Sequence, residues 1–488
     1  MQRWQTAIRW LWHQGGVNTS GRSPHHRIHP CRLLRPWSAH AGALSPRPFR
    51  SHDELSAHPE TARGDSISFF APGVFAGIAS RTGGDNVPRE SFITLISVEN
   101  KATPLTILQE RPGPNIHHSG QAQTTWPRTL RRAVFLVPAG IALLAGLDAA
   151  LILLGVSAPV ITKRLPQVHG MLMVFGFVGT LVSLERAVAL RRRLGFFAPA
   201  LLGVGGLLLL APVPMYVGKL VQLAGAIAFV AVYVPLWRRQ RDDAVLIQAF
   251  GAVLAVGALI LWLGGVEVAV LAPWLAGFVI LTIGGERLEL ARMTMGARAA
   301  RDLLTLSAIL VVAITTSLLW PSAGYPLLGV ALLILVIWLA IHDVARLTIR
   351  STGLPRFAAG CMLAGYFWLA VAAITWLIGG AAFAGPRYDT ILHAVFLGFT
   401  ISMIMAHAPV ILPAVLRQPL PYHRAMLVPA ILLHLSLVVR VWLGDALQLQ
   451  TAWQVGGVLN ITALLLFVLV AAWSALRGPS ASSVRNGP

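Results

Sequence analysis

Long apolar segments recur along most of this chain and restrict it to one class of fold. About twelve of them have roughly 18–25 residues, which is the length that crosses a bilayer as a helix. Only 12% of the 488 residues are charged, whereas soluble proteins carry about a quarter. We therefore expect an all-α, polytopic membrane protein in the lipid bilayer, with about twelve transmembrane helices.

The chain divides into three regions. Residues 1–130 are rich in Arg, Pro, Ser, His and Gly and have no long apolar run. We expect them to be disordered or to be a spurious extension upstream of the true start. Residues 131–477 are expected to form the transmembrane domain, and residues 478–488 a disordered C-terminal tail. The predicted spans lie near residues 133–156, 166–190, 196–213, 218–237, 246–264, 266–285, 302–320, 324–342, 356–380, 389–413, 423–441 and 452–475.

The basic residues indicate how the chain is oriented in the membrane, rather than binding to a nucleic acid. The formal net charge is +20, but the Arg and Lys residues lie in the N-terminal region and in short loops. Clusters such as Arg191-Arg192-Arg193 and Arg238-Arg239 fall in alternate loops, and the opposite loops hold few positive charges. The positive-inside rule then predicts an even number of helices and both termini in the cytoplasm of a bacterial inner membrane. No nucleic-acid partner is expected.

A short motif recurs in the second, sixth and tenth predicted spans. Each copy has a Gly-Phe pair, and a polar residue lies nine positions after the glycine. The pairs are Gly176 with Glu185, Gly277 with Glu286, and Gly398 with His407. A motif in every fourth helix predicts three four-helix units in a pseudo-threefold arrangement.

Three histidines are candidate metal ligands. His169 lies near the outer end of the second span, and His393 lies at a similar depth in the tenth. His434 lies in the middle to outer half of the eleventh span, so the three side chains can converge. Imidazole is a common ligand for haem iron and copper. The alternative is that each histidine forms a hydrogen bond with a neighbouring carbonyl group.

The inner ends of the same spans carry further polar residues. His407 lies about 21 Å deeper than His393 along the helix, so the two cannot bind one metal ion. It is either a second ligand or a hydrogen-bond partner of backbone carbonyls. The pairs Glu185-Arg186 and Glu286-Arg287 occupy equivalent positions. Adjacent helical residues point about 100° apart, so we expect Glu of one unit to pair with Arg of the next. The alternative role is a proton-entry carboxylate.

This layout resembles the catalytic subunit of haem-copper oxidases and, more closely, NnrS-type membrane proteins, which are linked to haem, copper and nitric oxide stress. The resemblance covers residues of about 131–477. It is carried by Val168-His169-Gly170 with Gly176-Phe177, and by Leu392-His393-Ala394 with Gly398-Phe399. It implies a haem and/or copper cofactor held by His169 and His393, and a small gas such as nitric oxide as ligand. It names no redox partner.

The chain also departs from both families. The oxidases place a copper ion on helices 6 and 7, but here the sixth span has Glu286 and no histidine, and the seventh has none. The resemblance therefore does not extend to a conventional oxygen-reducing centre. The Trp-Asn segment associated with NnrS proteins is replaced by Ser183-Leu184-Glu185-Arg186.

Two functions compete at this point, and no catalytic residue is assigned for either. The first is a haem- or copper-binding membrane protein in nitric oxide or redox stress handling. The second is a transporter whose polar residues line a substrate or proton path. Transporters commonly show two repeated halves, whereas this motif occurs three times, which favours the first. A metal-free structural membrane protein is the third alternative.

Overall fold

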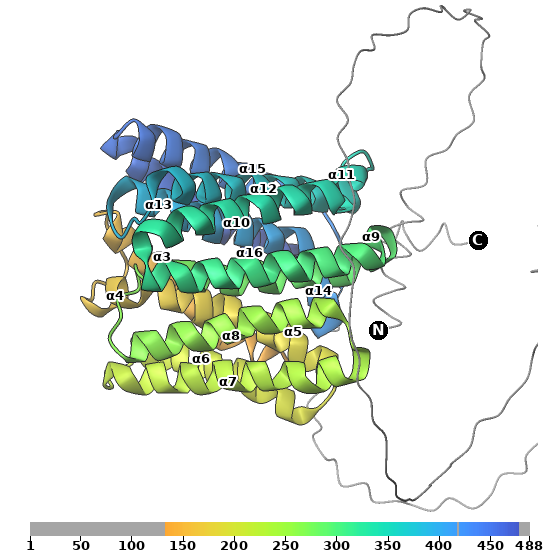
Figure 1. Ribbon diagram of the computed structural model, residues 1–488. Coiled ribbons are helices and arrows are strands. Elements are labelled where there is room, and N and C mark those ends of the chain that lie inside the picture. The colour runs from red at the N-terminus through yellow and green to blue at the C-terminus, as the bar shows by residue number, and fades with distance from the viewer. Residues whose placement is uncertain (1–131, 417–418, 478–488) are drawn as a thin grey trace, which may run out of the picture. The chain divides into compact units, whose positions relative to one another are not determined.

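The computed structural model describes residues 132–416 and 419–477, and within these ranges it contains helices and no strands. By length and composition, eleven of the described helices can cross a membrane. The protein is therefore an all-α polytopic membrane protein, as predicted (Figure 1). The predictions for residues 1–130 and 478–488 lie outside the described residues.

The helices follow one another with short connections. Three of the spans contain a π-helical segment between or after their α-helical parts, and these segments are η1, η3 and η5. In chain order the elements are α3 (Leu136–Leu153), α4 (Arg164–Met171), η1 (Leu172–Gly179), α5 (Thr180–Leu190), the 3-10 turn η2 (Arg193–Phe196), α6 (Phe197–Leu210), α7 (Met215–Gln240), α8 (Asp243–Leu263), α9 (Ala272–Leu319), α10 (Pro321–His342), α11 (Ala345–Thr348), α12 (Leu354–Gly379), α13 (Gly385–His393), η3 (Ala394–Ile401), α14 (Ser402–Leu416), the 3-10 turn η4 (Arg424–Met426), α15 (Leu427–Val438), η5 (Val439–Ala446) and α16 (Gln450–Arg477).

The sixth span differs from its prediction. Helix α9 has 48 residues and is bent at Gly296, whose φ of 77° is a conformation that glycine adopts readily. The part after the bend, Arg298–Leu319, is one of the eleven apolar helices, whereas the part before it is not. The sequence becomes charged at Glu286, which is why the predicted span stops at residue 285. The helix continues because its charged side chains are paired inside the bundle, as described below.

The three spans that carry the repeated motif are neighbours in the interior. Phe175 of η1 stacks on Phe278 of α9, with 5.6 Å between ring centroids. Helix α9 also contacts η3, and α5 contacts α14. The second, sixth and tenth spans therefore meet one another, as three quasi-equivalent units require.

The glycine of each motif copy is a point of close helix contact. A Cβ atom on Gly176 would lie 2.9 Å from the Cβ of Ala142 in α3. On Gly277 it would lie 2.6 Å from Leu254 in α8, and on Gly398 it would overlap Trp368 in α12. In all three units one partner belongs to the preceding span, and the added Cβ of Gly277 would also overlap Ile314 of the following span. Absence of a side chain is what permits this approach.

We expect Gly398→Ala to destabilise the protein by about 1–3 kcal/mol, the usual cost of overpacking a filled interior. The added methyl group meets the Cβ and ring of Trp368, which are held close to the backbone. Unfolding of the purified protein in detergent, followed by helical circular dichroism, measures the effect. Gly140→Ala in α3 is the matched control, because nothing lies within 4 Å of its added Cβ atom. Equal stability of the two variants would contradict this account of the motif.

Candidate functional site

A cavity of about 390 Å³ is lined by two histidines, His169 of the second span and His393 of the tenth. Its walls come from α3, α4, η1, α9, α13, η3, η5 and α16. Helices α4 and α13 lie at the same end of the bundle, whereas α11 lies at the other end (Figure 1). The volume falls in the usual range of about 300–1,000 Å³ for ligand sites, and most of the lining is apolar. We call this space the histidine cavity.

Both histidines are oriented by backbone carbonyl groups. Nδ1 of His169 lies 2.9 Å from the carbonyl oxygen of Gly146 in α3. Nδ1 of His393 lies 2.8 Å from the carbonyl oxygen of Asp389, one turn earlier in α13. A carbonyl accepts only from a protonated nitrogen, so Nδ1 donates, and in a neutral ring Nε2 then keeps its lone pair. Neither Nε2 atom has a hydrogen-bond partner among the described residues.

A bidentate ion pair supports His393. Arg440 of η5 donates from Nε and Nη2 to the two carboxylate oxygens of Asp389, each at 2.8 Å. One of these oxygens also lies 3.3 Å from Nδ1 of His393. The guanidinium group lies 5.2 Å from the ring centroid of Trp453 in α16. Arg440 thus joins three elements of the cavity wall and carries a positive charge there, neutralised by Asp389.

One polar group on the wall is unsatisfied. Asn460 of α16 is 2% exposed, and its Oδ1 accepts a hydrogen bond of 2.8 Å from Ser436. Its Nδ2 has no partner among the residues that the structure describes, although Asn460 lines the cavity. A buried donor without an acceptor is costly. The cavity therefore offers two imidazole lone pairs and one free amide donor to a molecule inside it.

All three π-helical segments among the described residues contribute to this wall. Met173 belongs to η1, Phe396 to η3 and Arg440 to η5. The first two segments begin three residues after His169 and one residue after His393. π-helical turns are rare and often occur at functional sites. The three π-helical segments therefore mark the same cavity as the two histidines, on separate grounds.

His434 does not join the other two histidines. It accepts a hydrogen bond of 3.1 Å at Nδ1 from Trp368, and its Nε2 lies 3.3 Å from the hydroxyl of Ser402. It is not part of the cavity lining. Among the described residues, no three His, Cys, Asp or Glu side chains are arranged to hold a metal ion. This differs from the predicted three-histidine site, because depth along a helix does not determine which face a residue occupies.

A second polar group of residues lies toward the C-terminal ends of the second and sixth spans. Arg186 of α5 donates to Glu185 at 2.9 Å, to Glu286 at 3.4 Å and to Glu289 at 2.8 Å. Gln248 of α8 donates to Glu289 at 3.2 Å. We call these five residues the glutamate cluster. The predicted pairing between units is present in the contact of Arg186 with Glu286.

The contact of Arg186 with Glu185 corrects a prediction. Their Cβ atoms point about 100° apart, which led us to expect no pairing between adjacent residues. The guanidinium group is far enough from the backbone to fold back over the neighbouring carboxylate, and it forms that bond as well as the one to the next unit.

A third group surrounds Arg287. Its guanidinium group donates twice to Asp343, each at 2.8 Å, and once to Nε2 of His407 at 2.9 Å. Tyr366 donates to Asp343 at 2.6 Å, and Nδ1 of His407 lies 2.6 Å from the carbonyl oxygen of Met403. Both nitrogens of His407 are therefore occupied. The structure supports its role as a hydrogen-bond partner rather than a metal ligand.

Sequence reasoning passed over several of these residues. Asp343 follows a predicted span, so it resembled a loop residue, although it is completely buried. Arg440 lies at the end of a predicted span, where arginine is an ordinary interfacial residue. Their partners are 51 or more positions away in sequence. The one available signal was the presence of charge at the edge of an apolar segment.

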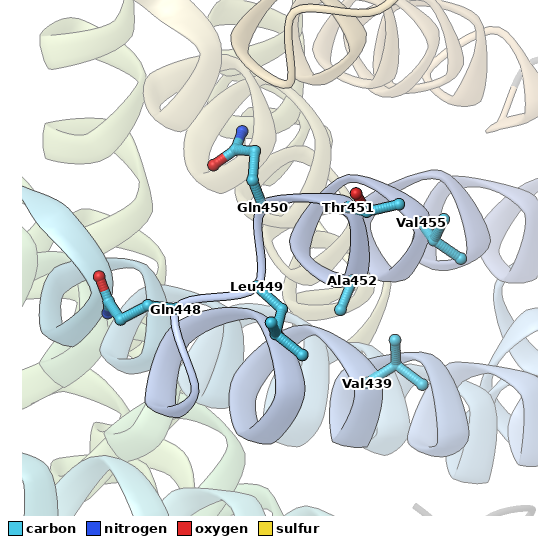
Figure 2. Close-up of a pocket in the computed structure, with 7 residues that line it drawn as sticks. All are labelled: Val439, Gln448, Leu449, Gln450, Thr451, Ala452 and Val455. Atoms are coloured by element: carbon cyan, nitrogen blue, oxygen red, sulfur yellow. The ribbon is translucent and has the colours of Figure 1, made fainter.

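A second hollow lies at the turn between η5 and α16. It has a volume of about 470 Å³, is wide open, and is lined by Val439, Gln448, Leu449, Gln450, Thr451, Ala452 and Val455 (Figure 2). None of these side chains is ionisable or a usual metal ligand. The histidine cavity is therefore the stronger candidate site.

We expect Asp343→Asn to destabilise the protein by about 3–5 kcal/mol, because it leaves the buried charge of Arg287 without its counter-ion. The side chains of Arg287 and Asp343 are 5% and 0% exposed. Asp302→Asn is the control, since Asp302 is exposed on α9. Unfolding in denaturing detergent measures both variants. If Asp343→Asn unfolds at the same detergent concentration as the wild type, the pair does not stabilise the bundle.

The comparisons with known proteins give a family and no function. No curated protein and no solved structure matches the chain. A family model described as Domain of unknown function (DUF8744) matches residues 132–476. This match begins and ends with the helical bundle described above. The chain therefore belongs to the DUF8744 family.

Proposed function

We propose that this protein is an integral membrane haem-binding protein that takes part in redox or nitric oxide stress handling. The observation that carries the proposal is the pair formed by His169 and His393. They lie on different helices, line one cavity, and each has an oriented Nδ1 and a free Nε2. Metal-binding histidines usually donate their second nitrogen to a carbonyl or carboxylate in this way.

The residues present fit a haem better than a bare copper ion. A haem brings four nitrogen ligands of its own, so the protein needs to supply only axial ligands, and two histidines suffice. A copper ion held by side chains alone needs more ligands than the cavity offers, since His434 is engaged elsewhere. The apolar lining suits a porphyrin. Arg440 and the amide of Asn460 suit its acidic or polar substituents.

Each residue has a separate part in this proposal. His169 and His393 would bind the iron through Nε2. Asp389 and the carbonyl of Gly146 keep the two imidazole rings in the required tautomer and orientation. Arg440 holds Asp389 in place and contributes positive charge near the cofactor. A haem held there would supply one-electron transfer and binding of a small gas such as nitric oxide.

The resemblance to NnrS-type proteins agrees with this proposal but rests on short motifs. The transporter alternative has no comparable observation behind it. The charged groups near the other ends of these spans form ion pairs with one another. Metal chemistry at the outer cavity is therefore the better-supported function.

We expect the full chain, expressed with haem supplied and purified in detergent, to show a Soret absorption band. His169→Ala and His393→Ala should each abolish or strongly shift this band, because each removes one ligand. His407→Ala and His434→Ala are the controls and should keep it, since neither side chain lines the cavity.

A glycine variant separates ligand loss from misfolding. In His169→Gly, imidazole added to the buffer has room to replace the missing side chain and should restore the band. Wild-type protein without a chromophore, after expression with haem and copper supplied, would end the proposal. So would an unchanged band in both His169→Ala and His393→Ala.

A further inference from the structure

Among the described residues, the glutamate cluster has more acidic groups than its one cation neutralises. Three carboxyl groups, from Glu185, Glu286 and Glu289, surround the single guanidinium of Arg186. The side chains of Glu185 and Glu286 are about a tenth exposed. Two unbalanced negative charges in such surroundings are strongly unfavourable. Some of this charge must be removed by a bound positive species.

Glu185 and Glu286 share one hydrogen-bond donor. Both accept from Nη2 of Arg186, at 2.9 Å and 3.4 Å, so a single nitrogen atom brings their carboxyl groups together. Two carboxylates have no hydrogen atom to share, whereas a carboxyl group and a carboxylate can share one proton. Neighbouring carboxyl groups in apolar surroundings commonly do so.

One atom of the cluster residue Gln248 has no partner among the described residues. Gln248 is completely buried, and its Nε2 donates to Glu289, but its Oε1 is unpaired. The hydroxyl of Tyr233 is also buried and unpaired among the described residues, and it belongs to α7, which packs against α5. Gln248 therefore offers a free acceptor beside the glutamates.

The other charges nearby are already balanced. Arg287 follows Glu286 on α9, but it is paired with Asp343. His407 of α14 accepts from Arg287 and bonds to the carbonyl of Met403. The described part of the chain has no set of three acidic or histidine side chains arranged for a metal ion. A proton is therefore the positive species that fits.

One member of the cluster is partly exposed. The side chain of Glu289 is 26% exposed, whereas those of Glu185 and Glu286 are about 10% exposed. Glu289 shares Arg186 with both of them. It is therefore the member of the cluster best placed to exchange a proton with the surroundings.

We propose that Glu185 and Glu286 form a proton-binding site, which holds one proton between the two carboxyl groups and exchanges it with water through Glu289. Binding converts two carboxylates into a hydrogen-bonded carboxyl–carboxylate pair, and Arg186 then faces two negative charges instead of three. Release returns the proton to water by the same route. The site does not require a cofactor, so it stands apart from the function proposed for the histidine cavity.

Infrared spectroscopy tests this proposal directly on the full chain in detergent. A protonated carboxyl group has a carbonyl stretching band distinct from those of a carboxylate. At neutral pH we expect such a band, which shifts in heavy water, shifts on labelling with carboxyl-labelled glutamate, and disappears at alkaline pH. Glu185→Gln and Glu286→Gln should each lose it, since the remaining glutamate beside Arg186 is ionised. Glu267→Gln, which alters an exposed residue between α8 and α9, should keep it.

A second measurement needs only the wild-type protein, so it does not depend on whether the variants fold. An apolar carbodiimide reacts with protonated carboxyl groups in apolar surroundings. We expect its adduct on Glu185 or Glu286 at neutral pH, and less of it at alkaline pH, by mass spectrometry of peptides. Absence of the labelled glutamate band at neutral pH, together with an adduct confined to other residues, would overturn the proposal. Persistence of the band in both glutamine variants would do so as well.

Discussion

Charge inside an apolar bundle must be neutralised locally, and three arginines satisfy this requirement by joining helices. Arg186 links α5 to α9, Arg287 links α9 to α14 and to Asp343, and Arg440 links η5 to α13. An arginine separated from its partner would leave a bare charge in the interior, at a cost of several kcal/mol. The ion pairs therefore restrict the relative positions of these helices. Apolar contacts alone would allow one span to slide along another.

The histidine cavity depends on one of these pairs. Asp389 binds Arg440 through both carboxylate oxygens, and its backbone carbonyl orients the ring of His393. The opposite histidine is held by a carbonyl of α3 instead. Both rings are therefore oriented by backbone carbonyl groups, but only the carbonyl that orients His393 belongs to a residue held by an ion pair. The two sides of the site differ in how strongly they depend on charge.

Much of the fold follows from hydropathy, and part of the site follows from residue type. The predicted spans match the helices except where Glu286, Arg287 and Glu289 interrupt the apolar run of α9. The repeated motif singled out the three spans that meet in the interior, and His169 and His393, which were expected to converge, line one cavity. What sequence did not supply was the partner of each polar side chain. Asp343, Arg440 and Asn460 acquire their environments from residues on other helices, and Trp368 and Ser402 draw His434 away from the cavity.

The π-helical segments have a consequence for how this family tolerates change. In an α-helix each residue adds about 100° of rotation, and η1 lies between His169 and the Glu185-Arg186 pair. The wider turn of η1 therefore sets the angle between the outer and inner functional faces of one continuous helix. Loss of a single residue there would rotate the inner end by about 100° relative to the outer one. Such a deletion would turn Glu185 and Arg186 away from their partners, or His169 away from the cavity, although none of these residues is changed. The number of residues in η1 therefore matters as much as their identity.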